Sequence, residues 1–232
     1  VLFRFLSCVL LNAYTETVLY TRYRHVPRLD LALYRLSPSD FMMLHAYADY
    51  DAREAFEPGA AKRIRQWSLP LEAPRNEIRF IKIAMTDAED EPLPPGIYFL
   101  EINVPELLEA DPDRTPTRYT FIRSYVNLVL KRTATESMVW ATDLATGEPL
   151  AGEPVRMHSE VRGWHGAGRT NDDGLWIAEN LEAISLWDDG FAFMGDPGEE
   201  IFAVATSRWD NGISPWDYNL NTNYGDGDYV GY

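Results

Sequence analysis

The sequence predicts an all-β protein that contains two antiparallel β-sandwiches in tandem, with one short helix in the first. Aromatic residues make up 13% of the 232-residue chain, and its 15 glycines and 15 prolines favour short strands joined by turns. Apolar and polar side chains alternate along most segments between these turns, which is the period of a half-buried strand. A chain of this length buries a core in one large domain or two ordinary ones without cross-links.

The first strands are expected close to the N-terminus. The apolar run at residues 1–11 is too short, and too interrupted by Arg4, to span a membrane, so we expect a buried first strand there. Residues 5–8 also resemble a lipoprotein cleavage site, although apolar residues follow instead of a polar tether. The segments 16–23 and 28–36 are rich in leucine, aromatic and β-branched residues and predict two further strands.

One short helix is predicted directly after the strand at 28–36. Ser37 can accept a hydrogen bond from free backbone N–H groups, and Pro38 suits the first helical position. Asp40 places a negative charge at the positive end of the helix dipole. An apolar stripe that begins at Phe41 extends the prediction to about Tyr50.

The strand pattern resumes at 64–71, at 78–85 and again at 97–102. Both faces of the segment 78–85 are partly apolar, which predicts a central strand covered by the opposite sheet and by a neighbouring element. Between residues 104 and 120 the chain is polar and loses its periodicity, so we expect a long loop there.

The domain boundary is predicted near Arg123 or Ser124. The first domain closes on a strand at 119–122, and a new run of strands begins at 125–131. Residues 1–123 then form the first sandwich, and residues 124–232 form the second together with a C-terminal tail rich in glycine and aromatic residues.

The most specific stretch of the sequence lies in the second half. Residues 138–157 read as strand, turn and strand, with a tight reversal at Thr146-Gly147-Glu148-Pro149. A second turn follows at Asn171-Asp172-Asp173-Gly174, where short polar side chains bond locally to the backbone and the glycine can take a positive φ. We interpret these aspartates, and Asp226 and Asp228 in the tail, as turn residues and not as calcium ligands.

This arrangement resembles the N-terminal macroglobulin-like (MG) domains of the bacterial α2-macroglobulin family. The resemblance rests on a strand that ends in Asp143-Leu144, a Thr-Gly-x-Pro turn at 146–149, a Pro154-Val155 strand and a Thr-Asx-x-Asp-Gly turn at 170–174. The segments 31–36 and 95–100 resemble the paired strands of the preceding module more loosely. The match spans most of residues 16–206 and implies immunoglobulin-like, macroglobulin-type sandwiches in both domains.

The resemblance also implies a function. Members of this family are large proteins of many modules, several of which form a ring or scaffold, and many trap proteases through a thioester in a Cys-Gly-Glu-Gln motif. That motif is absent here, and Cys8 is the only cysteine. The resemblance therefore implies a non-catalytic structural module pair of a protease-inhibitor or defence scaffold that is periplasmic, extracellular or part of the cell envelope. Its partners would be neighbouring domains of the parent chain, and proteases only through the whole assembly.

Composition and motifs argue against other classes of function. Thirty-six acidic residues against 21 basic ones give a net charge of −15, which repels nucleic acid and anionic lipid surfaces. The four histidines are scattered, so no metal site or other cofactor is predicted. The sequence has neither a nucleophile motif nor a phosphate-binding glycine loop, and we predict that the chain is not an enzyme.

The seven tryptophans suggest a binding surface. Trp164, Trp187, Trp209 and Trp216 fall in or beside expected loops, where an aromatic ring can stack on a sugar or contact a partner, so these four are the candidate partner contacts. The alternative is that they fill the core or the junction between the domains. Two other functions remain open: an independent recognition module, such as an adhesin or a carbohydrate-binding sandwich, and an accessory domain of an envelope enzyme.

Overall fold

The computed structural model describes residues 9–45, 55–72, 76–112, 114–133, 135–179 and 189–207. Up to Ser124 the strands are β1 (Val9–Asn12), β2 (Val18–Tyr23), β3 (Arg28–Leu36), β4 (Arg63–Pro70), β5 (Arg79–Ala84), β6 (Gly96–Asn103) and β7 (Thr117–Ser124). The later strands are β8 (Val126–Arg132), β9 (Glu136–Asp143), β10 (Pro154–Ser159), β11 (Gly163–Arg169), β12 (Leu175–Glu179), β13 (Gly190–Met194) and β14 (Ala203–Thr206). The helical elements are α1 (Pro38–His45), η1 (Ala60–Lys62) and α3 (Pro105–Ala110).

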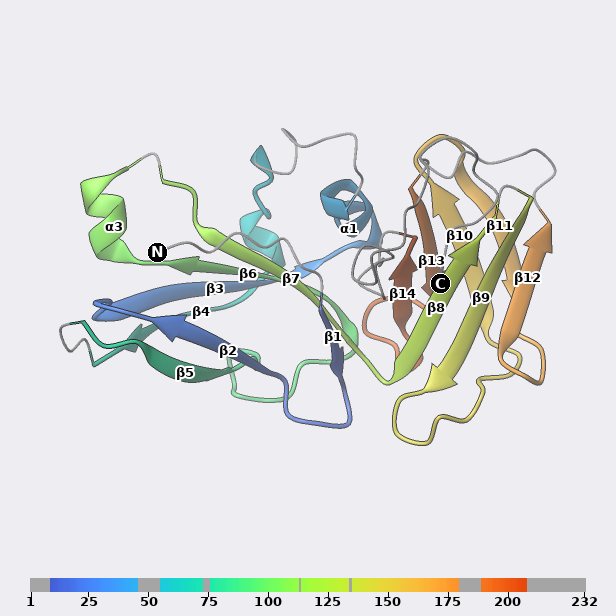
Figure 1. The fold of residues 1–232 in the computed structure, drawn as a ribbon, viewed down its shortest axis with the longest axis horizontal. Helices are drawn as coiled ribbons and strands as arrows, with labels where there is room; N and C mark the ends of the chain where they lie inside the picture. The colour runs from blue at the N-terminus through green and yellow to red at the C-terminus, as the bar shows by residue number, and fades with distance from the viewer. Residues whose placement is uncertain are drawn as a thin grey trace, which may run out of the picture.

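The strands form four sheets, which lie as two stacked pairs along the long axis of the molecule (Figure 1). The first pair is a five-stranded sheet in the order β1-β7-β6-β3-β4 and a two-stranded sheet of β2 and β5. The second pair is a four-stranded sheet in the order β11-β10-β13-β14 and a three-stranded sheet in the order β12-β9-β8. All pairings are antiparallel except that of β1 with β7. The predicted all-β class of antiparallel sandwiches is confirmed.

Two of the three buried cores fill these sandwiches. One lies between the five-stranded sheet and β2–β5, where Leu29, Leu31 and Leu33 of β3 pack with Tyr98 and Leu100 of β6. Alternate residues of β3 therefore face this core, as the leucine spacing predicts. The other core joins the two sheets of the second half through the residues Val126, Leu128, Val139, Ala141, Val155, Met157, Ala192, Met194, Ala203 and Ala205.

Helix α1 begins where the sequence predicts. The backbone N–H of Ser37 donates to Asp40 Oδ2 at 2.9 Å, and the N–H of Asp40 donates to Ser37 Oγ at 3.2 Å. This reciprocal pair satisfies two groups that the first turn leaves free. Phe41 and Leu44 are buried, as expected for the apolar stripe. The predicted extension over residues 46–50 lies outside the described residues, as do residues 1–8 of the first apolar run.

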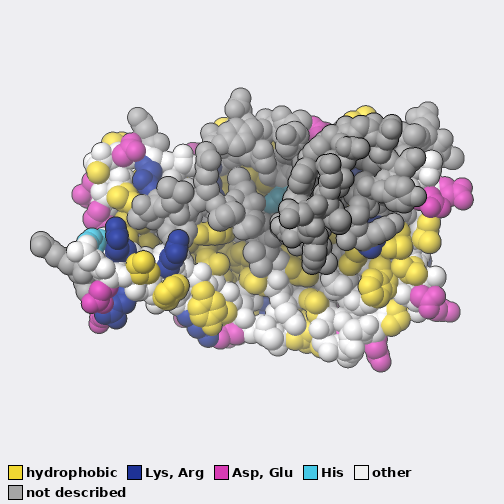
Figure 2. Space-filling model, viewed as in Figure 1, with side chains coloured by type: hydrophobic (Ala, Val, Ile, Leu, Met, Phe, Trp, Pro, Cys, Tyr) yellow, Lys and Arg dark blue, Asp and Glu magenta, His cyan; other side chains and the backbone are white. Residues whose placement is uncertain are grey.

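The structure corrects two expectations in the first half. Among the described strands β5 pairs only with β2, and Phe80 is 75% exposed, so the prediction of a covered central strand at 78–85 is wrong. Figure 2 shows hydrophobic side chains at the surface in this region. The loop expected at 104–120 contains helix α3, in which Pro105 occupies the first turn. A proline there costs no hydrogen bond, so it marks a helix start and not a loop.

Strand β11 is not among the strands that the sequence predicts. The three glycines between residues 163 and 168 are typical of a turn, yet the segment pairs with β10 along its length. A Cβ atom on Gly168 would lie 2.0 Å from Nε1 of Trp176, and one on Gly166 would lie 3.1 Å from the same ring. The indole of Trp176 therefore lies across the strand, and only glycine leaves room for it.

The turn at Asn171–Gly174 follows the sequence prediction. Asn171 Oδ1 accepts the backbone N–H groups of Asp173 and Leu175 at 3.0 and 2.9 Å. Gly174 has a φ of +72°, and a Cβ there would lie 2.4 Å from the backbone oxygen of Ala141.

We expect Gly174→Ala to lower the free energy of unfolding by about 1–3 kcal/mol, because alanine is strained at positive φ and meets a backbone atom. Chemical denaturation measures this loss. Gly59→Ala is the matched control, because a Cβ there meets no atom within 4 Å. Equal effects of the two substitutions would contradict the assignment of this turn.

Candidate functional site

A third buried core joins the residues before Ser124 to those after it, and we call this core the seam. It is formed by Tyr34, Leu36, Phe41, Leu44, Phe56, Ile97, Phe99, Ile122, Phe191, Phe193, Phe202 and Val204. Phe41 of α1 meets the rings of Phe191 and Phe193 at centroid distances of 6.0 and 6.4 Å, edge to face. Such aromatic contacts add stability beyond the area that they bury.

The seam is made by strands that are covered on both faces. All five residues of β13 are buried: Phe191 and Phe193 face the seam, while Ala192 and Met194 face the second sandwich core. The side chains of strand β6 also alternate between two cores, since Phe99 faces the seam and the adjacent Tyr98 and Leu100 face the first sandwich core. Successive side chains of a strand point to opposite faces, so one strand serves two cores. The two sandwiches therefore share apolar surface directly.

Hydrogen bonds reinforce the seam where the chain crosses from β7 to β8. Ser124 Oγ donates to the backbone oxygen of Phe202 at 2.5 Å and accepts the N–H of Val126 at 2.8 Å. The N–H of Gly198 donates to the backbone oxygen of Pro95 at 2.8 Å. These bonds satisfy buried backbone groups of both halves and fix the position of β14 next to β7.

The guanidinium of Arg123 forms three hydrogen bonds just before the chain crosses from β7 to β8. Its Nε donates to Thr17 Oγ1 at 2.8 Å, and its terminal nitrogens donate to the backbone oxygens of Ala13 and Leu93. Arg123 is only 5% exposed, so its charge is stabilised by these three acceptors and not by solvent. The arginine thereby ties the β1–β2 and β5–β6 connections to the end of β7.

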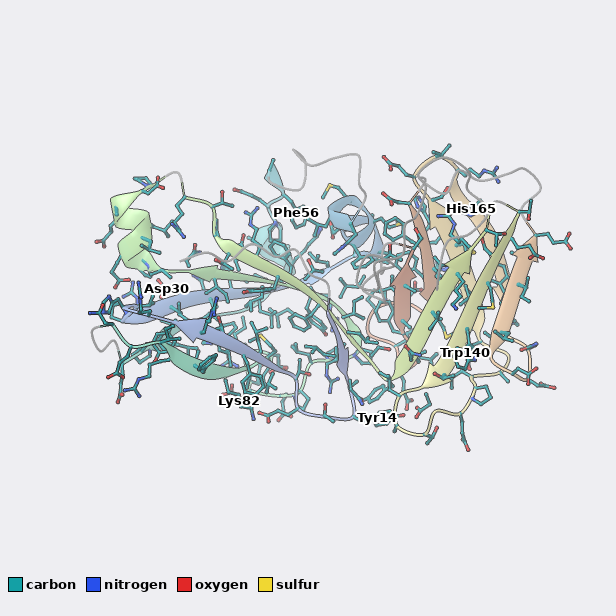
Figure 3. All side chains as sticks on the ribbon, viewed as in Figure 1. Tyr14, Asp30, Phe56, Lys82, Trp140 and His165 are labelled. Atoms are coloured by element: carbon teal, nitrogen blue, oxygen red, sulfur yellow. The ribbon has the colours of Figure 1, made fainter. Side chains whose placement is uncertain are left out.

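A second link lies at the surface beside the seam. The hydroxyl of Tyr14 donates to Asp143 Oδ2, and the Tyr14 ring meets Tyr125 edge-on with centroids 4.6 Å apart. Asp143 Oδ1 also accepts the backbone N–H groups of Ala145 and Thr146, both at 2.8 Å. Figure 3 shows Tyr14 where the β1–β2 connection approaches the second sandwich.

These bonds give Asp143 a defined pH response. The hydrogen bond from Tyr14, followed by the bond from the Thr146 backbone, lowers the pKa of Asp143 below its usual value. A lowered folded-state pKa contributes stability above the unfolded-state pKa of about 4, and this contribution is lost as the pH falls through the folded-state value.

We therefore expect Asp143→Asn to be less stable than the parent chain at pH 7 and to differ less from it at about pH 2. Urea midpoints measured across this range test the prediction. Asp172→Asn, in an exposed turn, is the control for the general loss of negative charge. A difference between parent and Asp143→Asn that stays constant with pH would contradict it.

The four candidate tryptophans are not brought together among the described residues. Trp187, Trp209 and Trp216 lie outside the residues that the structure describes. Trp164 is the second residue of strand β11, beside the turn that joins β10 to β11, and is 51% exposed. Its ring meets His158 and Phe193 at centroid distances of 5.2 and 5.6 Å.

An arginine lies over the Trp164 ring. The Arg156 guanidinium is 5.3 Å from the ring centroid and pairs with Asp196 at 2.6 Å. A sugar platform needs a free ring face, and this cation lies over the Trp164 ring.

Neither a metal-ligating cluster nor a membrane-spanning helix is found among the described residues. No group of three or more His, Cys, Asp or Glu side chains in this part of the chain converges on a position where a metal ion would bind. No helix among the described residues is long and apolar enough to cross a membrane.

Comparison with solved structures identifies the architecture. Native alpha-2-macroglobulin from Escherichia coli spanning domains MG0-NIE-MG1 superposes with a TM-score of 0.57 and 14% identity, over 82% of this chain and 58% of that one. The fragment spanning NIE-MG1 gives 0.55 and 14% identity, over 80% of this chain and 86% of that one. The chain shares its fold with bacterial α2-macroglobulin domains. The resemblance that the turn motifs indicate is thus confirmed at the level of fold.

The similarity covers a small part of the larger relative. A mutant alpha-2-macroglobulin from Salmonella gives a TM-score of 0.53 at 13% identity, over 83% of this chain but only 11% of that one. The chain therefore corresponds to a fraction of that protein. No family model matches the sequence, and no curated protein matches it either.

The sequence analysis did not find the seam residues, although one signal for them exists. The segment Gly190–Met194 is apolar at every position after its glycine, which is typical of a strand covered on both faces. Arg123 was assigned only to the domain boundary, because no sequence pattern shows that a lone arginine is buried. The contact of Tyr14 with Asp143 joins residues too far apart in the sequence to be paired by inspection.

Proposed function

We propose that this chain is a structural module pair of a larger bacterial α2-macroglobulin-like protein. The two modules are residues 1–123 and 124–232, and they act by shape, without catalysis, in a protease-inhibitor or defence scaffold that is periplasmic, extracellular or part of the cell envelope. The fold similarity supports this proposal because it extends over both sandwiches of the chain. The strand pairing is also consistent with it, since the described strands before and after Ser124 form separate sheets.

The seam is the observation that carries the proposal. A scaffold has to hold its modules at a fixed angle, and loosely linked domains move relative to each other unless their interface is large and apolar. Phe41, Phe191, Phe193 and Phe202 are each at most 1% exposed in a core that both halves share. Such a core supports a role in which the two modules keep a fixed orientation within a multidomain protein.

The partners under this proposal are neighbouring domains of the parent chain, and proteases only through the whole assembly. Trp164 remains a candidate contact, because half of its surface is exposed beside a cation on the four-stranded sheet. Trp187, Trp209 and Trp216 remain candidates on sequence grounds alone.

Reading the coding sequence on both sides of these residues tests the proposal. We expect further β-sandwich modules of about 100 residues each, with strand and turn motifs like those at 143–174. A Cys-Gly-Glu-Gln motif in one of them would add thioester trapping to the parent protein. A reading frame bounded by these two sandwiches alone would overturn the proposal and favour an independent recognition module.

A further inference from the structure

The outer edge of β2 carries backbone groups that no described strand uses. The N–H of Met85 donates to the backbone oxygen of Thr17 at 2.8 Å, and Val18 lies opposite Ala84. Hydrogen-bonded and non-bonded pairs alternate in an antiparallel ladder. The N–H and C=O groups of Val18, Tyr20 and Arg22 therefore point away from β5. Among the described strands β2 pairs with β5 alone, so no described strand uses this edge.

A small pocket lies beside this edge and below α3. It has a volume of about 50 Å³, and its apolar lining includes Leu29, Ile102 and Leu107. Arg22 of β2 and Arg114 also line it. This volume suits the end of one apolar side chain and is too small for a drug-sized ligand.

Arg22 and Arg114 line the pocket and Arg24 follows on the chain from β2, while α3 on the opposite wall carries the acidic residues Glu106 and Glu109. No ion pair is formed by Arg22, Arg24 or Arg114 within the described part of the chain. The other cations of this end are already neutralised, in the pairs Arg28–Asp30, Arg79–Glu77 and Lys82–Glu16. Figure 2 shows Lys and Arg side chains between hydrophobic ones at this end of the molecule. Because β2 itself contains no acidic residue and Arg22 and Arg24 form no ion pair among the described residues, the β2 edge favours an acidic occupant.

We propose that the β2 edge and its pocket bind an extended acidic segment of a partner polypeptide. The segment adds a strand to β2 through the outward backbone groups and places one apolar side chain in the pocket. Its carboxylates lie near Arg22, Arg24 and Arg114. Backbone pairing gives such a complex its affinity, and the pocket gives it selectivity.

The alternatives fit this edge less well. A second copy that paired through its own β2 would offer no carboxylate from that strand to Arg22 or Arg114, because residues 18–23 contain no acidic residue. An anion or lipid headgroup would meet the arginines but would leave the strand edge unused. The inference depends on the geometry of β2 and stands whether or not the chain belongs to a larger scaffold.

Fluorescence polarisation with a labelled peptide of about ten residues that alternates aspartate with valine tests the proposal. We expect the peptide to bind the full chain, with NMR shifts at the amides of Val18, Tyr20 and Arg22. N-methylation of alternate peptide amides removes strand pairing without altering the protein and is expected to weaken binding at least about tenfold. Lysine in place of aspartate is expected to abolish it.

The protein variants give the complementary result. Arg22→Glu combined with Arg114→Glu is expected to weaken binding at least about tenfold, while Arg169→Glu, on distant β11, changes it less than about twofold. Absence of binding, or equal binding of the N-methylated or lysine peptide, would overturn the proposal. Displacement of the peptide by phosphate or by phosphatidylglycerol vesicles would also overturn it, in favour of a plain anion site. Dimerisation of the chain that competes with the peptide would instead assign this edge to a second copy.

Discussion

Replacing Phe191 by alanine is expected to lower the free energy of unfolding by about 3–5 kcal/mol. Phe191 is 1% exposed, and its ring lies 6.0 Å from that of Phe41 and 6.4 Å from that of His158. Removal of the ring leaves a cavity between two sandwiches that cannot collapse without moving relative to each other. Guanidinium unfolding followed by tryptophan fluorescence measures the loss.

The control for Phe191→Ala is a substitution of a strand residue that lies at the surface. Ile177 of β12 is 58% exposed, and Ile177→Ala is expected to change stability by no more than about 0.5 kcal/mol. A cost below about 1 kcal/mol for Phe191→Ala would mean that the two halves do not share a packed core.

Arg123→Met is expected to cost about 3 kcal/mol, although methionine keeps much of the length and apolar volume of the side chain. The substitution leaves the backbone oxygens of Ala13 and Leu93 without their donor in a buried position. A buried acceptor that loses its partner costs its full desolvation energy, which is about 1–3 kcal/mol. Chemical denaturation at pH 7 measures the sum of these effects.

Arg24→Met separates this effect from the simple loss of a positive charge. Arg24 is exposed and is expected to tolerate the change within about 0.5 kcal/mol. An equal loss of unfolding free energy in Arg123→Met and Arg24→Met would mean that the hydrogen bonds of Arg123 do not stabilise the connection from β7 to β8.

Local chemistry explains which elements the sequence predicts well. The strand at 28–36 follows from leucine alternation, and α1 follows from the pairing of Ser37 with Asp40. The turn at Asn171–Gly174 follows from side chains that bond within a few residues. In each case the residues that determine the structure are neighbours in the sequence.

The elements that the sequence analysis missed depend on contacts between distant residues. The sequence analysis assigns no strand to β11, whose glycines leave room for the ring of Trp176 across the strand. Residues 78–85 and 190–194 are both partly apolar on two faces, yet Phe80 is 75% exposed while Phe193 is 1% exposed. What differs is the neighbour: α1 and the five-stranded sheet cover β13, whereas no described element covers the outer face of β5.

The central claim is that the seam holds the two sandwiches as one rigid body. Amide ¹⁵N relaxation tests it most directly, because it reports how each half tumbles in solution. We expect amides of β3 and β6 and amides of β10 and β13 to give one common rotational correlation time. Two distinct correlation times, each typical of a single sandwich, would contradict the claim and with it the proposed role as a fixed module pair.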